Sequence, residues 1–192
     1  PIQVVIVPIY KEEEQLNQIS EFAFDLVDQL RKKGVSVKYD NDDAKKPGWK
    51  FAEYELKGVP LRIAIGPRDL EKGTVEIARR DTLTKQFANQ DQVIHTVQNL
   101  LDEIQNDLFN NAMSFNKQNS NEATTIEEMN EILNEKGGFV YAYWDGKKES
   151  ELKIKELTKA TIRCIPIGDS CKGDCILTGS KNAIKVVFAR AY

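Results

Sequence analysis

The sequence of 192 residues has one histidine, three cysteines and no apolar run near the roughly 20 residues that a membrane-spanning helix needs. His95 has no partner histidine, so a nucleophile with a histidine base is hard to assemble, and we expect His95 to be structural or exposed. An odd number of cysteines argues against a disulfide framework. A glycine-rich phosphate loop and a signal-peptide pattern are also missing. We therefore identify no catalytic centre and no membrane segment in the sequence.

Acidic side chains outnumber basic ones over most of the chain. The net charge is -3 and the pI is near 5.4, which argues against a protein that coats nucleic acid over its whole surface. The charge is uneven, however, because residues 45–82 hold nine Lys and Arg against six Asp and Glu, and the remainder carries -6. Any basic surface is therefore local.

That basic segment, PGWKFAEYELKGVPLRIAIGPRDLEKGTVEIARRDT at residues 47–82, has a spacing that places functional side chains together. A helix over residues 49–57 puts Phe51 and Glu55 on one face, and Gly58 ends it. In the strand that follows, Leu61 and Ile63 point one way while Arg62 points the other. The spacing thus predicts an aromatic ring, a carboxylate and a guanidinium group at neighbouring positions.

The same strand runs out into a Gly-Pro turn that presents Arg68 and Asp69, near the carboxyl end of the strand, where open α/β sheets tend to bind ligands. An arginine fork matches O6 and N7 of guanine, a carboxylate matches its N1-H and N2-H2 donors, and an aromatic ring can stack on an unpaired base. Two such pairs could read two guanines. The alternative is that Glu55 with Arg62, and Arg68 with Asp69, form solvated surface ion pairs of little consequence.

The segments GWKF, ELKGVPLR, GPRD and RRDT occur in order and at family-like spacing. They resemble the anticodon-binding domain of class II prolyl-tRNA synthetases, in the archaeal and eukaryotic-like form that carries an extra C-terminal domain. The resemblance runs from VVIVPI at residues 4–9 to FARAY at residues 188–192 and covers nearly the whole chain.

This resemblance implies recognition of the two consecutive guanines of proline anticodons. It places Phe51 at the stacking position, Glu55 and Arg62 at one guanine, and Arg68 and Asp69 at the other. Four basic residues are further candidates for contacts with the tRNA backbone, namely Lys50, Lys57, Arg79 and Arg80.

The resemblance also implies partners outside the chain. Proline, ATP and magnesium would belong to a separate N-terminal catalytic domain, towards which the terminal Tyr192 would dock. We expect tRNA(Pro) as the partner, with no DNA and no membrane, in a cytoplasmic protein that is homodimeric at full length. Because the chain begins at Pro1, directly before a strand, we expect a fragment without cofactors of its own.

The fold class expected is α/β. Residues 1–115 predict the order β-α-β-α-β-β-α, with strands near residues 2–9, 35–40, 61–66 and 74–82 and helices near residues 11–33, 49–57 and 90–115. The resemblance implies the class II anticodon-binding fold, a mixed five-stranded sheet with flanking helices, followed by a small α/β C-terminal domain. The last helix should bury one face, made of Val93, Val97, Leu100, Leu101, Ile104 and Leu108.

Polar residues 116–125 predict a linker, and residues 126–192 a second domain. This domain should open with a helix capped by Thr125 and Glu128 and continue with a strand at 139–144, a helix at 150–159 and strands at 161–167 and 184–192.

Related synthetases often hold zinc in this domain through four cysteines. Here the matching positions fall near Trp144 and Glu149, where no cysteine stands, and at Cys175 and Thr178. We predict that zinc is lost and that no metal is bound. A makeshift site at Cys171 and Cys175 is the alternative, and Cys164 is expected to be a buried strand residue.

Two other functions fit parts of the sequence. A free-standing accessory or regulatory protein could reuse the fold for protein interaction, and a small α/β enzyme could place its site at the GPRD turn. Loss of binding when both anticodon guanines are replaced would separate tRNA recognition from both.

Overall fold

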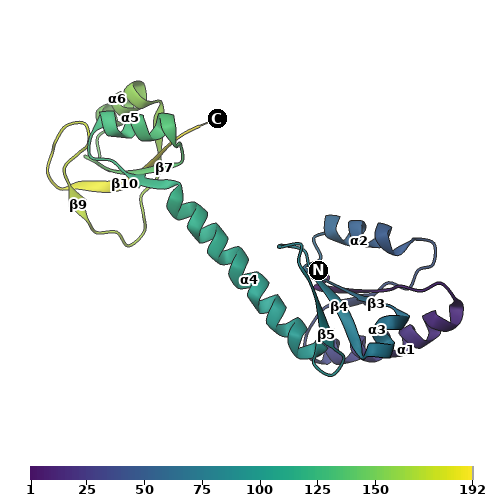
Figure 1. The fold of residues 1–192 in the computed structure, drawn as a ribbon. Coiled ribbons are helices and arrows are strands. Elements are labelled where there is room, and N and C mark those ends of the chain that lie inside the picture. Colours follow the sequence, from purple (N-terminus) through teal and green to yellow (C-terminus); the bar gives the residue numbers. More distant parts are fainter. Residues whose placement is uncertain (192) are drawn as a thin grey trace. The chain divides into compact units, whose positions relative to one another are not determined.

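The computed structural model describes residues 1–191, which form two compact units (Figure 1). The first unit is Pro1–Leu108, and the second begins at Phe109. Among the described residues, no helix combines the length and the apolar composition that crossing a bilayer requires.

A mixed five-stranded sheet organises the first unit, as predicted, with the strand order β2-β1-β3-β4-β5. The three parallel strands are β1 (Val4–Pro8), β2 (Val37–Tyr39) and β3 (Leu61–Ile65). Two antiparallel strands, β4 (Thr74–Arg79) and β5 (Lys85–Asn89), complete the sheet. Since β1 pairs with both β2 and β3, the chain crosses the sheet between β2 and β3, and the crossover carries the helix α2 (Pro47–Leu56).

The main core lies on the sheet face that α1 (Glu13–Lys32) and α4 (Val93–Gln118) cover. Both helices bury an apolar stripe at helical spacing, for example Ile19 and Leu26 on α1 and Val97 and Ile104 on α4. Leu108 contradicts the prediction, because 54% of it is exposed. The buried stripe of α4 ends at Ile104, since the core of this unit extends no further along the helix.

The opposite face of β1 packs under α2. Val5 and Val7 alternate with the residues of the main core and contact Tyr54 and Val59, with Phe51 at the margin. This smaller cluster fixes the position of α2 over β1.

Two elements of the first unit were not predicted. The expected turn after β3 is a short helix, α3 (Pro67–Lys72), which starts with Pro67 at its first turn and ends at Gly73 with a φ of 64°. The edge strand β5 has the sequence KQFAN, in which only Ala88 is buried. The sequence therefore lacks the alternation of apolar and polar residues that predicts a strand.

The second unit contains another sheet of the order β6-β7-β10-β8, with β9 paired to β10. Its strands are β6 (Ser120–Glu122), β7 (Phe139–Trp144), β8 (Ala160–Cys164), β9 (Lys172–Gly173) and β10 (Ala183–Arg190). Helices α5 (Ile126–Glu135) and α6 (Lys148–Thr158) supply Met129 and Ile154 to a core around Phe188. The small α/β architecture agrees with the expectation.

The linker expected at residues 116–125 is regular structure for much of its length. α4 continues to Gln118, and β6 then pairs in parallel with β7. The polar composition predicted a linker because the side chains at the end of α4 and in β6 face solvent for the most part. Thr125 does cap α5, accepting a 3.1 Å hydrogen bond from the backbone N-H of Glu128.

The positions expected from zinc-binding relatives hold a polar network instead. Oδ2 of Asp145 accepts a 3.2 Å hydrogen bond from Thr178, and Oδ1 of Asp145 accepts one from Ser150. Nε1 of Trp144 donates to Ser150 at 3.2 Å. The network joins the end of β7, the first turn of α6 and the turn before β10.

The cysteines differ in their surroundings. Cys175 is buried, and Cys171 is exposed. Cys164 is exposed as well, which contradicts the prediction that it is a buried strand residue, because it ends the half-exposed strand β8.

Candidate nucleic-acid interface

Arg62 is a buried charge on the sheet face that α2 partly covers. Its side chain is 8% exposed, and its guanidinium carbon lies 3.6 Å from the centroid of the Phe51 ring. Nη1 of Arg62 stands 3.6 Å from Oε1 of Glu76, beyond normal hydrogen-bond length. Nε and Nη1 of Arg62 are buried, and neither has a hydrogen-bond partner among the described residues.

The environment of Arg62 opposes its charge. Burial lowers the pKa of the Arg62 guanidinium, while the nearby carboxylates of Glu76 and Glu55 counteract that effect. Arginine nevertheless stays protonated in proteins, so two donor nitrogens of a buried cation lack an acceptor. Leaving buried donors unpaired is costly, so an oxygen or nitrogen acceptor that came within reach of Nε or Nη1 would be bound favourably. Both atoms are covered, and the pocket beside them is only about 10 Å³, so an acceptor reaches them only when the surrounding side chains move.

Glu55 lies beside Arg62 with its carboxylate free. Phe51, Glu55 and Arg62 line one small pocket together with Tyr54 and Val59. Glu55 is exposed, and within residues 1–191 its carboxylate makes no hydrogen bond or ion pair, so the surface ion pair considered as an alternative is not formed. The structure thus assembles the ring, carboxylate and guanidinium that the spacing predicted.

Arg68 and Asp69 line a different pocket, between the ends of β1 and β3, with Tyr10 and Lys11. Oδ2 of Asp69 accepts a 2.8 Å hydrogen bond from the backbone N-H of Gly66 and thereby caps α3. Arg68 is exposed. The five predicted base-reading residues therefore form two separate groups.

The predicted backbone contact at Lys50 is wrong. Lys50 is 2% exposed, and its ammonium donates a 2.8 Å hydrogen bond to the carbonyl oxygen of Asp40 and lies 3.3 Å from the Asp40 carboxylate. Tyr54 donates to the same carboxylate at 2.7 Å. Lys50 is thus a structural ion-pair residue that phosphate cannot reach.

The other three candidates for contacts with the tRNA backbone differ in whether carboxylates already pair with their charge. Arg79 contacts three carboxylates, at 2.7 Å from Asp81, 3.2 Å from Glu103 and 2.8 Å from Asp107. Hydrogen bonds to Asp81 and Asp107 raise the pKa of Arg79. Such a neutralised arginine is a poor phosphate ligand. Arg80 is exposed.

Lys57 is exposed and lies 2.6 Å from Glu53. Exposed ion pairs of this kind contribute little and exchange readily with solvent. Lys57 and Arg80 therefore stay candidates for backbone contacts.

The sequence reasoning missed Glu76. Its carboxylate lies between Arg62, at 3.6 Å, and Lys85, at 3.4 Å. The alternation of β4 could have revealed it, because Glu76 is opposite Ala64 and so faces the same way as Arg62.

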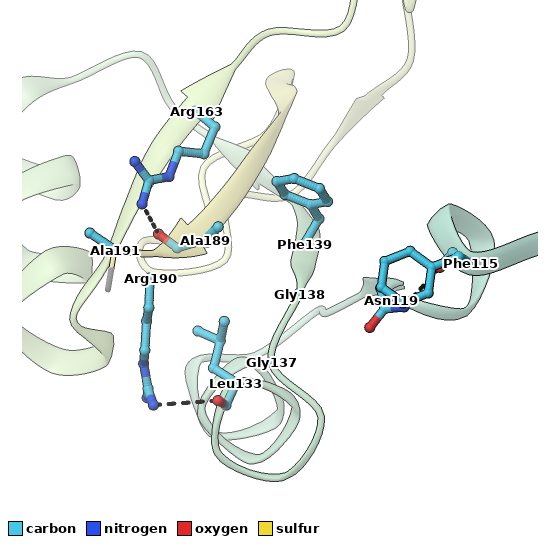
Figure 2. A pocket seen from close by; sticks show the side chains of 10 residues that line it. All are labelled: Phe115, Asn119, Leu133, Gly137, Gly138, Phe139, Arg163, Ala189, Arg190 and Ala191. Atoms are coloured by element: carbon cyan, nitrogen blue, oxygen red, sulfur yellow. Dashed lines mark hydrogen bonds between the residues drawn. The ribbon is translucent and has the colours of Figure 1, made fainter. Parts of the chain in front are cut away.

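Figure 2 shows a cavity of the second unit, which has a volume of about 640 Å³. Its two arginines are already engaged: Nη2 of Arg163 donates to the carbonyl of Ala189, and Arg190 donates to the carbonyl of Leu133 and to Asn134. The rest of the lining is mainly apolar, including Phe115 and Phe139. Tyr192, the predicted docking residue, lies outside the described residues.

Other chemistry has little support in residues 1–191. His95 is exposed, as predicted, and its Nδ1 lies 3.0 Å from Asn99. No three His, Cys, Asp or Glu side chains gather as a metal site within that range. The zinc-free state stays a prediction.

Comparison with known proteins decides the family. Residues 3–100, half of the chain, match the family model described as anticodon binding domain. The chain belongs to the anticodon-binding domain family. Residues 126–192 match the model described as prolyl-tRNA synthetase, C-terminal.

Three curated relatives of the chain carry the same name. The chain is 58% identical to a proline–tRNA ligase of Christiangramia forsetii, 56% to one of Porphyromonas gingivalis and 52% to one of Flavobacterium psychrophilum. Each match covers 100% of this chain and 39% of the relative, so the chain spans about two fifths of their length. These relatives are bacterial, and the expected archaeal and eukaryotic-like form receives no support from them.

Proposed function

We propose that this chain binds proline tRNA and reads guanine in its anticodon, as part of a longer enzyme that joins proline to that tRNA. The observation that carries the proposal is Arg62, a buried guanidinium with two unpaired donors beside the free carboxylate of Glu55.

Guanine matches this pair of groups. Its O6 and N7 accept from a guanidinium fork, while its N1-H and N2-H2 donate to a carboxylate. Arg62 supplies the donors and Glu55 the acceptor, so an adenine would present the wrong groups to both. A mismatch of this kind costs on the order of 1–3 kcal/mol.

The role of Phe51 follows from its contact with Arg62. The guanidinium lies over the ring at 3.6 Å, so Phe51 holds the guanidinium plane by a cation–π contact. In our proposal the base lies at the edge of the guanidinium, in its plane, and overlaps only the part of the Phe51 ring that Arg62 leaves uncovered. Phe51 is then a positioning residue as well as part of the stack.

A second guanine would meet the pocket at Arg68 and Asp69. Arg68 is exposed and free to turn towards O6 and N7, while Asp69 has only Oδ1 left because Oδ2 caps α3. We therefore assign the larger share of this second recognition to Arg68.

The remaining parts of the proposal concern the longer protein. A separate catalytic domain would bind proline, ATP and magnesium, and Tyr192 would dock towards it. A cytoplasmic homodimer is the assembly that we propose. The second unit would hold together without zinc, through its core and the Asp145 network.

Filter binding tests the function directly. We expect the chain to bind a proline tRNA transcript and to lose most of that binding when both anticodon guanines are replaced by adenines. Glu55→Gln should reduce the difference between the two transcripts. Glu21→Gln is the matched control, because Glu21 is an exposed glutamate on α1. Equal binding of both transcripts by the unaltered chain would remove the proposed function.

A further inference from the structure

The face of the sheet that carries Arg62 continues past the pocket onto β4 and β5. In the antiparallel register, Arg62 is opposite Ala78, Ala64 is opposite Glu76, and Glu76 is opposite Phe87. Directly opposed residues share a face. This face is made of Arg62, Ala64, Glu76, Ala78, Lys85 and Phe87, and it is buried at Arg62 and Ala64 and exposed at Lys85 and Phe87.

The face is uncovered at its outer strand, β5. α2 packs over β1 through Tyr54, Val59, Val5 and Val7, and that cluster reaches neither β4 nor β5. Phe87 is accordingly 67% exposed. Its neighbour Ala88 points into the main core, which fixes β5 and hence the direction of the Phe87 side chain.

Phe87 has no aromatic or cationic partner of its own among residues 1–191. It stands opposite Glu76, which lies between the charges of Arg62 and Lys85. Neighbouring strands are about 4.8 Å apart, so the ring on β5 is about 10 Å from the Arg62 strand. An exposed ring thus lies within a few nucleotide lengths of the unpaired donors of Arg62.

We propose that Phe87 is a second stacking position, which takes an unpaired base next to the base read by Glu55 and Arg62. The inference rests on the proposed function and deepens it. Single-stranded nucleic acid is bound by aromatic rings placed along a positively charged track, and every base has a π-face that such a ring accepts. Lys85, whose side chain is 56% exposed, supplies a cation at the edge of the face for the connecting phosphate.

A protein partner fits this face less well. The exposed apolar surface is one ring, surrounded by charged groups of both signs. Interfaces between proteins have a core depleted of charged residues. A flat base above the ring with a phosphate over Lys85 leaves these charges solvated or paired.

The test uses the 192-residue chain and proline tRNA transcripts that carry 2-aminopurine at one unpaired anticodon-loop position other than the two guanines. Stacking on an aromatic ring quenches this fluorophore. We expect one labelled position to be quenched on binding, and we expect Phe87→Ala to abolish that quenching and weaken binding about tenfold. Phe87→Trp should retain both, and Phe87→Leu should retain neither.

The control variant is Phe24→Ala, which removes an exposed aromatic ring from α1, where it contacts Tyr39. It should leave binding and quenching unchanged. If Phe87→Ala or Phe87→Leu binds and quenches like the unaltered chain while the guanines still matter, the inference is overturned and the proposed function stands. If the guanines do not matter to the unaltered chain, the proposed function itself fails.

Discussion

Nε of Arg80 donates a 2.7 Å hydrogen bond to the backbone carbonyl of Glu55. The bond links the end of β4 to the last turn of α2 and so fixes where the Glu55 carboxylate stands relative to Arg62. A residue that the sequence predicted to contact the tRNA backbone thereby also positions Glu55, which we propose as a base-reading group.

Replacing Arg80 by alanine separates these two roles. A positioning role predicts that discrimination between guanine and adenine falls several-fold, because Glu55 is no longer held in place. A phosphate contact predicts that binding weakens for all transcripts and that the slope of log affinity against log salt falls by about one. We expect the first effect, measured by filter binding at several salt concentrations. A change in the salt slope with unaltered discrimination would assign Arg80 to the backbone.

Arg62→Met should separate stability from function. Replacing a buried, incompletely paired charge with an apolar side chain is often neutral or stabilising, and Glu76 retains Lys85 at 3.4 Å. We expect the free energy of unfolding in urea to change by less than about 1 kcal/mol or to rise, while tRNA affinity falls at least tenfold. A large loss of stability would show that Arg62 serves the fold.

We predict that Asp40 and Lys50 stabilise the fold and take no part in tRNA binding. Removing the carboxylate with Asp40→Ala leaves the Lys50 ammonium buried and should cost about 3 kcal/mol of the free energy of unfolding. Guanine discrimination by the folded protein should persist, since both residues lie outside the Arg62 pocket. Urea denaturation and filter binding measure the two quantities.

The same pair predicts a dependence on pH. Burial would raise the pKa of Asp40, but hydrogen bonds from Tyr54 and Lys50 outweigh burial, and the net pKa lies below the ordinary value. A lowered pKa gives stability that is present above the ordinary value, near 4, and is lost as pH falls through the lowered value. The difference in stability between the unaltered chain and Asp40→Ala should therefore shrink below about pH 4. A difference that grew on acidification would contradict the assignment.

The Asp145 network should stabilise the second unit in place of zinc. Asp145→Ala removes the acceptor of Ser150 and Thr178 and is expected to cost about 1–2 kcal/mol in the free energy of unfolding, whereas a chelator should have no effect. Metal analysis of the purified chain provides the check. One equivalent of bound zinc would contradict the prediction.

The sequence predicted most of the fold because its strong patterns coincide with burial. The alternation at Leu61, Ile63 and Ile65 and the stripe of α1 both face the main core. Patterns failed where side chains face solvent. β5 has one buried residue, and the polar residues after Phe115 form the end of α4 and β6.

The site was predictable in part for similar reasons. Helical spacing brought Phe51 and Glu55 together, and strand alternation placed Arg62 opposite the main core. The partner of Lys50 could not be foreseen, because Asp40 is close to it only through the crossover from β2 to α2. The sequence also did not predict that one carboxylate oxygen of Asp69 accepts the hydrogen bond that caps α3.

The most direct measurement of guanine reading is a pair of cycles, one for each guanine position, with four affinities in each cycle. It combines the unaltered chain and Glu55→Gln with proline tRNA carrying either guanine or inosine, which lacks the 2-amino group, at each of the two anticodon guanine positions in turn. We expect inosine at one position to weaken binding to the unaltered chain by about tenfold, and to have almost no further effect on Glu55→Gln. Equal inosine penalties for both proteins, at both positions, would contradict the account.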